Sequence, residues 1–268
     1  MWDVVQHDEN AGAGKRFGWL IADGMREVGR GVMVVADGFC GAPSVLFRKR
    51  ACAAWFGQMY TAGIGSLGVI SVVALFIGMI LALQIGIELR QFNQEGVIGA
   101  GVMVTMLREM GPMMTGIVLA ACVGSAMAAQ IGMMTVSEEI AALELMSVPP
   151  VRFLATPRLM ALLVMAPLLS FYTCVLGVFG GAVVGVTQFH LTWPQYFSVA
   201  MDMASNKALY VGLLKAAVFG VIIAGVACYE GFSARGGAVG VGEATRRSVI
   251  KSILLILVTG YIVTRFFY

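Results

Sequence analysis

Long apolar stretches separated by short charged segments dominate the chain from about residue 60 onwards. Each of these stretches approaches or exceeds the roughly 20 apolar residues that a helix needs to cross a bilayer. The pattern therefore predicts an all-α integral membrane protein with five transmembrane helices, at Ser66–Ile87, Pro112–Met134, Leu159–Val186, Ala208–Tyr229 and Ser252–Tyr268.

Charged residues lie in or beside the second and fourth predicted helices, and the fifth carries Arg265 near its end. The second apolar region starts at Val97 and is interrupted by Arg108, Glu109 and Pro112, and the fourth helix contains Lys215. The third is uncharged and would be about 42 Å long at the usual helical rise, against a hydrocarbon core of about 30 Å. We therefore expect the third helix to tilt or to project from the membrane.

The pattern of apolar and polar residues divides the chain into an N-terminal segment at residues 1–56 and a membrane domain at residues 57–268. Between Lys15 and Phe39, apolar residues recur at helical spacing while charged residues occupy the opposite face. This pattern predicts an amphipathic helix that lies in the headgroup plane, or alternatively packs on a soluble partner. The N-terminus is acidic and lacks the features of a cleaved signal, so we expect this segment to be retained.

The distribution of positive residues predicts the orientation. With the N-terminus inside, thirteen of the 18 Lys and Arg residues fall on the inner side. Only Arg90, Lys207 and Arg265 fall on the outer side, and Arg108 and Lys215 lie within the spans. The positive-inside rule therefore favours an N-in, C-out topology.

The inner connection between the second and third predicted spans reads as a short helix at about residues 135–148. Thr135 and Glu138 have the spacing of a capping box, and two prolines follow the helix. Its acidic residues run against the positive-inside trend, so the connection is either a solvated link or a docking helix for a cytoplasmic partner. The candidate contact residues are Thr135, Glu138, Glu139, Leu143, Glu144 and Met146.

Charged side chains at membrane depth are the strongest candidates for function. Such groups cost several kcal/mol unless they face a partner, a cavity or the interface. Arg108 and Glu109 point about 100° apart on a helix and do not pair with each other, whereas Lys215 is a candidate partner for Glu109. We expect Arg108, Glu109 and Lys215, with Gln84 and Glu88, to line the outer mouth of a cavity or a gate. The alternative is that the charges simply extend to the outer interface.

Composition agrees with a membrane protein, because 59% of residues are hydrophobic and 12% are charged, with a mean hydropathy of +0.87. A net charge of +3 gives no reason to expect nucleic acid binding. Neither His7 nor His190 belongs to a metal or catalytic arrangement, and the Gly12–Lys15 segment lacks essential parts of a phosphate-binding loop. The chain is therefore predicted to be neither an enzyme nor a cofactor-binding protein.

Small residues recur every fourth position at Gly177, Gly181 and Gly185, and at Gly124, Ala128 and Gly132. Such stripes allow helices to approach closely, either within the chain or across a homodimer. The two halves show no internal repeat of the kind found in many secondary transporters.

Several of these segments together resemble the MlaE/YrbE family of permeases. The resemblance covers about residues 60 to 265 and rests on Arg108-Glu109-Met-Gly111-Pro112, Gly124-Ser-Ala126, Glu139-Ile-Ala-Ala-Leu-Glu144, Pro157-Arg158, Lys215-Ala-Ala-Val-Phe-Gly220 and Tyr229-Glu-Gly231. It implies the homodimeric permease subunit of an ATP-driven phospholipid transporter in the inner membrane. ATP would bind to a separate cytoplasmic ABC ATPase, an MCE-domain subunit would carry lipid in the periplasm, and some systems add a STAS-domain protein. The resemblance also implies that residues 135–148 form the coupling helix, which is seated in the ATPase.

Two positions depart from the pattern of many members, which carry Arg and Glu where this chain has Cys122 and Gln130. The lipid class and the direction of transport stay open. So do a secondary transporter and a membrane anchor acting without an ATPase.

Overall fold

The computed structural model describes residues 31, 33, 35–38 and 49–268, and in these residues it is helical with no β-strand. Five helices or helical runs are long and apolar enough to cross a membrane, at Cys52–Arg90, Glu95–Val136, Pro150–Phe189, Asn206–Phe232 and Gly237–Phe267. The predicted class and number of spans are confirmed. The predicted orientation remains a prediction, as does most of the N-terminal segment, which lies outside the described residues.

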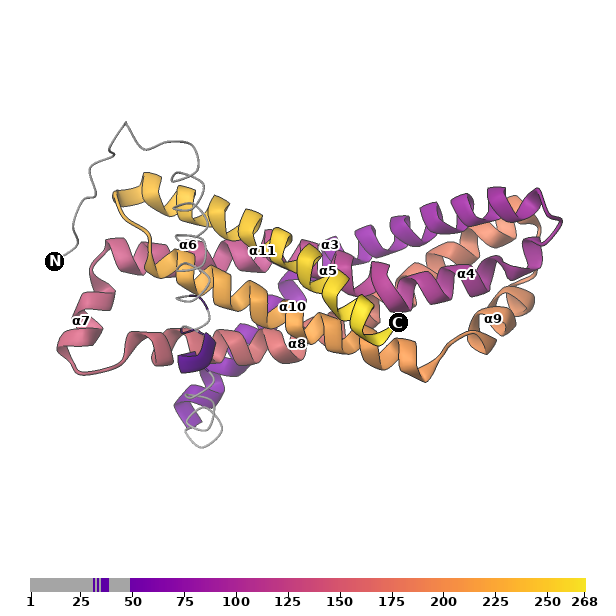
Figure 1. Ribbon diagram of the computed structural model, residues 1–268. Helices are drawn as coiled ribbons and strands as arrows, with labels where there is room; N and C mark the ends of the chain where they lie inside the picture. Colours follow the sequence, from indigo (N-terminus) through magenta and orange to yellow (C-terminus); the bar gives the residue numbers. More distant parts are fainter. Residues whose placement is uncertain (1–30, 32, 34, 39–48) are drawn as a thin grey trace, which may run out of the picture.

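Helix α3 (Lys49–Arg90) and helix α8 (Pro150–Phe189) are the two longest elements and pack along each other. At 42 and 40 residues they measure about 60 Å, twice the hydrocarbon thickness. The expectation that the third span projects therefore applies to the first span as well. Together with α4 (Ile98–Thr105) and α9 (Trp193–Asp202), they form the right-hand end of the molecule in Figure 1.

The second crossing is one continuous rod made of short pieces. It consists of η1 (Glu95–Val97), α4 (Ile98–Thr105), the π-helical turn η2 (Met106–Met110), α5 (Gly111–Leu119), a second π-helical turn η3 (Ala120–Gly124) and α6 (Ser125–Val136). The predicted charged break is thus a π-helical turn within the rod and not a loop.

The remaining elements are α7 (Glu139–Leu145), α9 (Trp193–Asp202), α10 (Asn206–Phe232) and α11 (Gly237–Phe267). The fifth span was predicted to begin at Ser252, which left Arg246, Arg247 and Lys251 in the inner connection before it. That boundary was wrong, because α11 begins at Gly237 and carries all three residues. Arg152 and Arg158 likewise lie on α8 and not in a loop. Charges on one face of these helices shortened the apolar runs in the sequence without ending the helices.

Glycines allow the closest helix contacts, and these contacts lie within the chain. A Cβ atom on Gly78 of α3 would overlap the Gly177 carbonyl of α8, and one on Gly180 would overlap the Leu75 carbonyl. In the second stripe, a Cβ on Gly124 would lie 3.0 Å from Ile223 of α10. Both stripes therefore support the interpretation as packing inside one chain.

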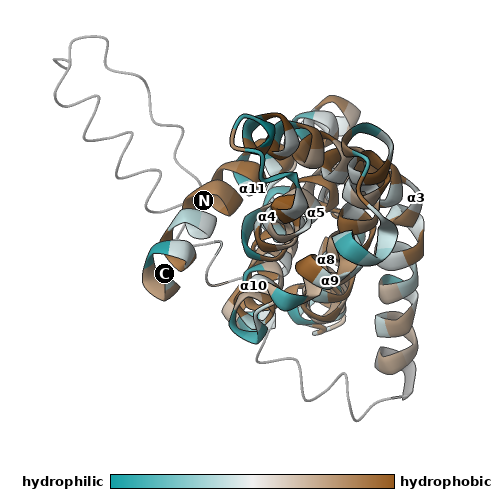
Figure 2. Cartoon of the chain, turned by 90° about the vertical axis from the view of Figure 1, so that its right-hand side faces the viewer, coloured by the Kyte–Doolittle hydropathy of each residue, from teal (hydrophilic) through white to brown (hydrophobic). Residues whose placement is uncertain are grey.

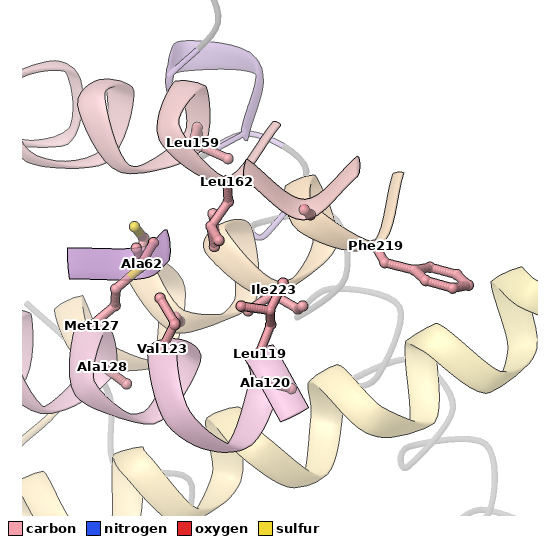
Figure 3. Packing of buried hydrophobic residues seen from close by; sticks show 14 of the residues in the cluster. Ala62, Leu119, Ala120, Val123, Met127, Ala128, Leu159, Leu162, Phe219 and Ile223 are labelled. Carbon is pink, nitrogen blue, oxygen red and sulfur yellow. The ribbon is translucent and has the colours of Figure 1, made fainter. Parts of the chain in front are cut away.

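Two buried apolar clusters hold the helices together. One joins α5, α6, α8 and α10 around Leu119, Leu162 and Ile223 (Figure 3). The other surrounds Tyr196 of α9, and burial raises the pKa of its phenol. Hydrophobic residues also occupy much of the length of the helices (Figure 2). Many of their side chains are exposed, including Phe76 and Phe266, at 58% and 83%. Outward-facing apolar side chains of this size match a lipid environment.

Candidate functional site

The Arg108-Glu109-Met-Gly111-Pro112 segment forms the π-helical turn η2 and the start of α5. Pro112 has no N–H, so the Arg108 carbonyl four residues earlier lacks its usual helical donor. Gly111 is required where α5 meets α8, because a Cβ there would overlap the Cys174 sulfur. π-helical turns frequently occur at functional sites. The lack of an N–H at Pro112 makes the Arg108 carbonyl available to a donor from another helix.

Lys215 of α10 donates a hydrogen bond to the Arg108 carbonyl. Its side chain is 1% exposed, and its Nζ donates to the Arg108 carbonyl at 2.9 Å, to Glu109 Oε1 at 2.7 Å and to Thr264 Oγ1 at 2.7 Å. An ammonium group has three hydrogens to donate, and all three are used here. The prediction that Lys215 is the partner of Glu109 is confirmed, and the pair is charge-neutral.

Thr264 brings α11 into the same network. Its hydroxyl lies 2.6 Å from Glu109 Oε1 and 2.8 Å from the Gly260 carbonyl. Glu109, Lys215 and Thr264, which we call the Lys215 cluster, therefore connect three crossings. They line a cleft of about 280 Å³, whose other walls include Met113, Phe219, Leu257 and Tyr261. Ionic groups and apolar side chains meet in one concave surface, as binding of an amphipathic molecule would require.

Arg108 points away from this cluster and is exposed. Its guanidinium lies 4.5 Å from the ring centroid of Tyr268, and Lys207 Nζ lies 5.2 Å from the same centroid. As expected, Arg108 does not pair with Glu109. We call Arg108, Lys207 and Tyr268 the Tyr268 cluster.

Gln84 and Glu88 are exposed on the last turns of α3, and neither lines the cleft at the Lys215 cluster. The structure of this single chain therefore does not bring them together with Arg108, Glu109 and Lys215. Helical spacing placed both on one face of α3, but it gave no information about which other helix that face meets.

The predicted coupling segment is a tight acidic turn around α7. The capping box was wrong: Thr135 belongs to α6, and its hydroxyl donates to the Ile131 carbonyl at 2.8 Å and lies 3.0 Å from the Gly231 carbonyl. Glu138 instead precedes α7 with φ 61°, and its side chain makes no capping bond.

Glu138, Glu139 and Glu144 are exposed, as are Leu145 (88%) and Met146 (65%), whereas Leu143 is half-buried. α7 lies at one end of the helical bundle, opposite α9 (Figure 1). An exposed turn that combines carboxylates with large apolar side chains is suited to protein contact.

Sequence reasoning missed a second ionic group near that end. Glu230 of α10 is 3% exposed, and its carboxylate binds Arg247 Nε at 3.1 Å and Lys251 Nζ at 2.7 Å. The available signal was the spacing of Arg247 and Lys251, which places both on one face of a helix and requires an acidic partner.

A second missed residue is Arg158, which is 6% exposed. It donates to the Leu154 carbonyl at 3.0 Å and to Gln130 Oε1 at 3.4 Å, and its Nε has no partner. Gln130 is thus a neutral neighbour of a buried cation.

Comparison with known proteins agrees with these features. The profile of the family described as permease MlaE matches residues 55–266. The chain is 32% identical over 248 residues to the intermembrane phospholipid transport system permease protein MlaE of Haemophilus influenzae, covering 92% of this chain and 94% of that protein. It is 35% identical over 211 residues to a probable ABC transporter permease of Rickettsia prowazekii, covering 79% of this chain and 82% of the relative. A probable ABC transporter permease of Synechocystis is 32% identical over 204 residues.

Proposed function

This chain belongs to the MlaE permease family, and we propose that it is the membrane-spanning subunit of an ATP-driven phospholipid transporter. It is a multi-pass inner membrane protein, and residues 49–268 contain five helices long and apolar enough to span the membrane. In the proposed assembly it works as a homodimer, ATP is hydrolysed by a separate cytoplasmic ABC ATPase, and a periplasmic MCE-domain subunit exchanges lipid with it.

The observation that carries the proposal is the Lys215 cluster. A phospholipid needs an apolar surface for its acyl chains and a polar region for its headgroup. The cleft combines apolar walls with the partly exposed Glu109 and Thr264, which the buried Lys215 holds in place. The π-helical turn positions these groups between α5, α10 and α11. A change in the packing of α11 would therefore alter the charged groups and the shape of the cleft together.

The exposed turn around α7 supports the proposed ATPase contact. Its carboxylates and the apolar side chains of Leu145 and Met146 are exposed, and α7 lies at one end of the helical bundle (Figure 1). We propose that this turn docks into a groove of the ATPase and transmits its movement to α6 and α8, the two helices that α7 connects.

The experiment is gentle extraction of the tagged chain from its native membrane, followed by mass spectrometry of the proteins and lipids that accompany it. We expect stoichiometric recovery of an ABC ATPase and an MCE-domain protein, with bound phospholipid. A STAS-domain protein would be a further component. An intact chain recovered alone, under conditions that preserve known assemblies of this kind, would favour a secondary transporter or an anchor.

A further inference from the structure

Arg158 of α8 is a buried cation with no carboxylate beside it. Its side chain is 6% exposed, and among the described residues it forms no ion pair. Its hydrogen bonds go to two neutral oxygens, the Leu154 carbonyl at 3.0 Å and Gln130 Oε1 at 3.4 Å, and its Nε donates to no group. A guanidinium stays charged in proteins, so it cannot escape the cost of burial by losing a proton. Arg158 therefore lacks an opposite charge.

The acidic groups on the neighbouring helices are engaged elsewhere. Glu230 of α10 is bound by two cations of α11, and Asp37 lies 3.7 Å from the exposed Arg152. The fully buried Cys228 of α10 is close enough to Arg158 for an electrostatic interaction, but a buried thiol behaves as a small apolar group. None of these described groups neutralises the guanidinium.

Gln130 connects Arg158 to a cleft of about 210 Å³ between α3 and the η3–α6 part of the second crossing. The apolar walls of this cleft, which we call the Gln130 cleft, include Ala62, Val123 and Met127, all labelled in Figure 3. No acidic residue is among the described residues that line it. Because Gln130 Oε1 accepts a hydrogen bond from Arg158, the amide hydrogens of Gln130 are directed to other positions. Neither these hydrogens nor those of Gln58, which also lines the cleft, are donated to a described group.

We propose that a small monovalent inorganic anion of the size of chloride binds at Gln130, between the Gln130 cleft and Arg158. Arg158 supplies the opposite charge, and the side-chain amides of Gln130 and Gln58 donate hydrogen bonds. The cleft has room for such an ion, since a water molecule takes up about 30 Å³ in the liquid.

The position of the site gives the anion a structural effect. Gln130 belongs to α6 and Arg158 to α8, the two helices that α7 connects. A bound anion therefore stabilises the contact between these helices next to the exposed turn around α7. This inference does not depend on which molecule the chain transports.

The test is thermal unfolding of the purified full-length chain in detergent, with gluconate replaced stepwise by chloride or bromide at constant ionic strength. An anion that binds only the folded chain should raise the unfolding midpoint by about 3–5 °C at about ten times its Kd. The shift should reach a plateau with concentration and should be similar for chloride and bromide, because both ions fit the same site. A wild-type chain with no saturable shift would overturn the proposal.

Gln130→Glu is the decisive variant, because it keeps Arg158 and places a carboxylate beside it. We expect this variant to lose the chloride-dependent shift and to unfold in gluconate at about the midpoint of the wild type in chloride. The matched control is Gln188→Glu, which makes the same change at an exposed position near the other end of α8 and should keep the full shift. A full shift in Gln130→Glu would overturn the site, and its loss in Gln188→Glu would do the same by indicating a general effect of charge.

Discussion

We predict that loss of Glu109 and loss of Lys215 from the Lys215 cluster destabilise the chain by different amounts. Changing Glu109 to Gln leaves an ammonium that is 1% exposed without a carboxylate, and breaking a buried pair in this way costs about 3–5 kcal/mol. Changing Lys215 to Met leaves a carboxylate that is 37% exposed, so solvent recovers part of the loss. We expect a cost of about 2 kcal/mol for Lys215→Met, mainly from the unpaired Arg108 carbonyl and the lost hydrogen bonds.

The double variant sharpens this prediction. With Glu109→Gln and Lys215→Met together, no buried charge is left unpaired, so the chain should be more stable than the Glu109→Gln variant alone. The assay is a double-mutant cycle from chemical unfolding of the chain in mixed micelles, with a coupling of about 3 kcal/mol expected, which exceeds the cost of Lys215→Met alone. Arg265→Gln is the control and should change stability by less than about 0.5 kcal/mol. Additive losses, or a larger loss in Lys215→Met than in Glu109→Gln, would refute the reasoning.

Three further predictions concern the other charged positions. Glu144→Lys should leave membrane insertion intact but lower recovery of the ATPase at least fivefold in co-purification; unchanged recovery would remove Glu144 from the docking surface. Glu230→Gln should lower the free energy of unfolding by about 2–3 kcal/mol, because Arg247 and Lys251 both lose the buried carboxylate that they contact. The exposed Glu243→Gln should cost below about 0.5 kcal/mol, and equal effects in unfolding experiments would contradict this. Gln130→Glu should raise stability by about 1 kcal/mol by giving Arg158 a carboxylate, and a loss of stability would show that Arg158 is already compensated.

The sequence was sufficient to predict the spans and one long-range pair. Uncharged stretches of this length have few alternatives to crossing a bilayer, because their backbone groups must be paired within a helix. The ion pair between Glu109 and Lys215 could be predicted from the sequence, because burying either charge at membrane depth costs free energy unless an opposite charge lies beside it.

Contacts made by ordinary polar residues could not be predicted in this way. Thr264 and Tyr268 lie in a predicted span, but nothing in their spacing shows which residues they meet across 150 positions of chain. Thr135 was misassigned because a threonine hydroxyl can bond to a carbonyl four residues earlier as readily as it can cap a following helix. Gln84 and Glu88 share one face of a helix, but their spacing does not show which other helix packs against that face.

The most direct test of the central claim is ATP-dependent movement of fluorescent phospholipid between proteoliposomes that contain the co-purified assembly and acceptor MCE-domain protein. The account predicts transfer by the wild-type chain and a loss of at least tenfold in Arg108→Ala and Glu109→Ala, with the assembly and its ATPase subunit still present. Wild-type transfer rates in both variants, with equal amounts of assembled protein, would contradict the assignment of phospholipid transport to this site.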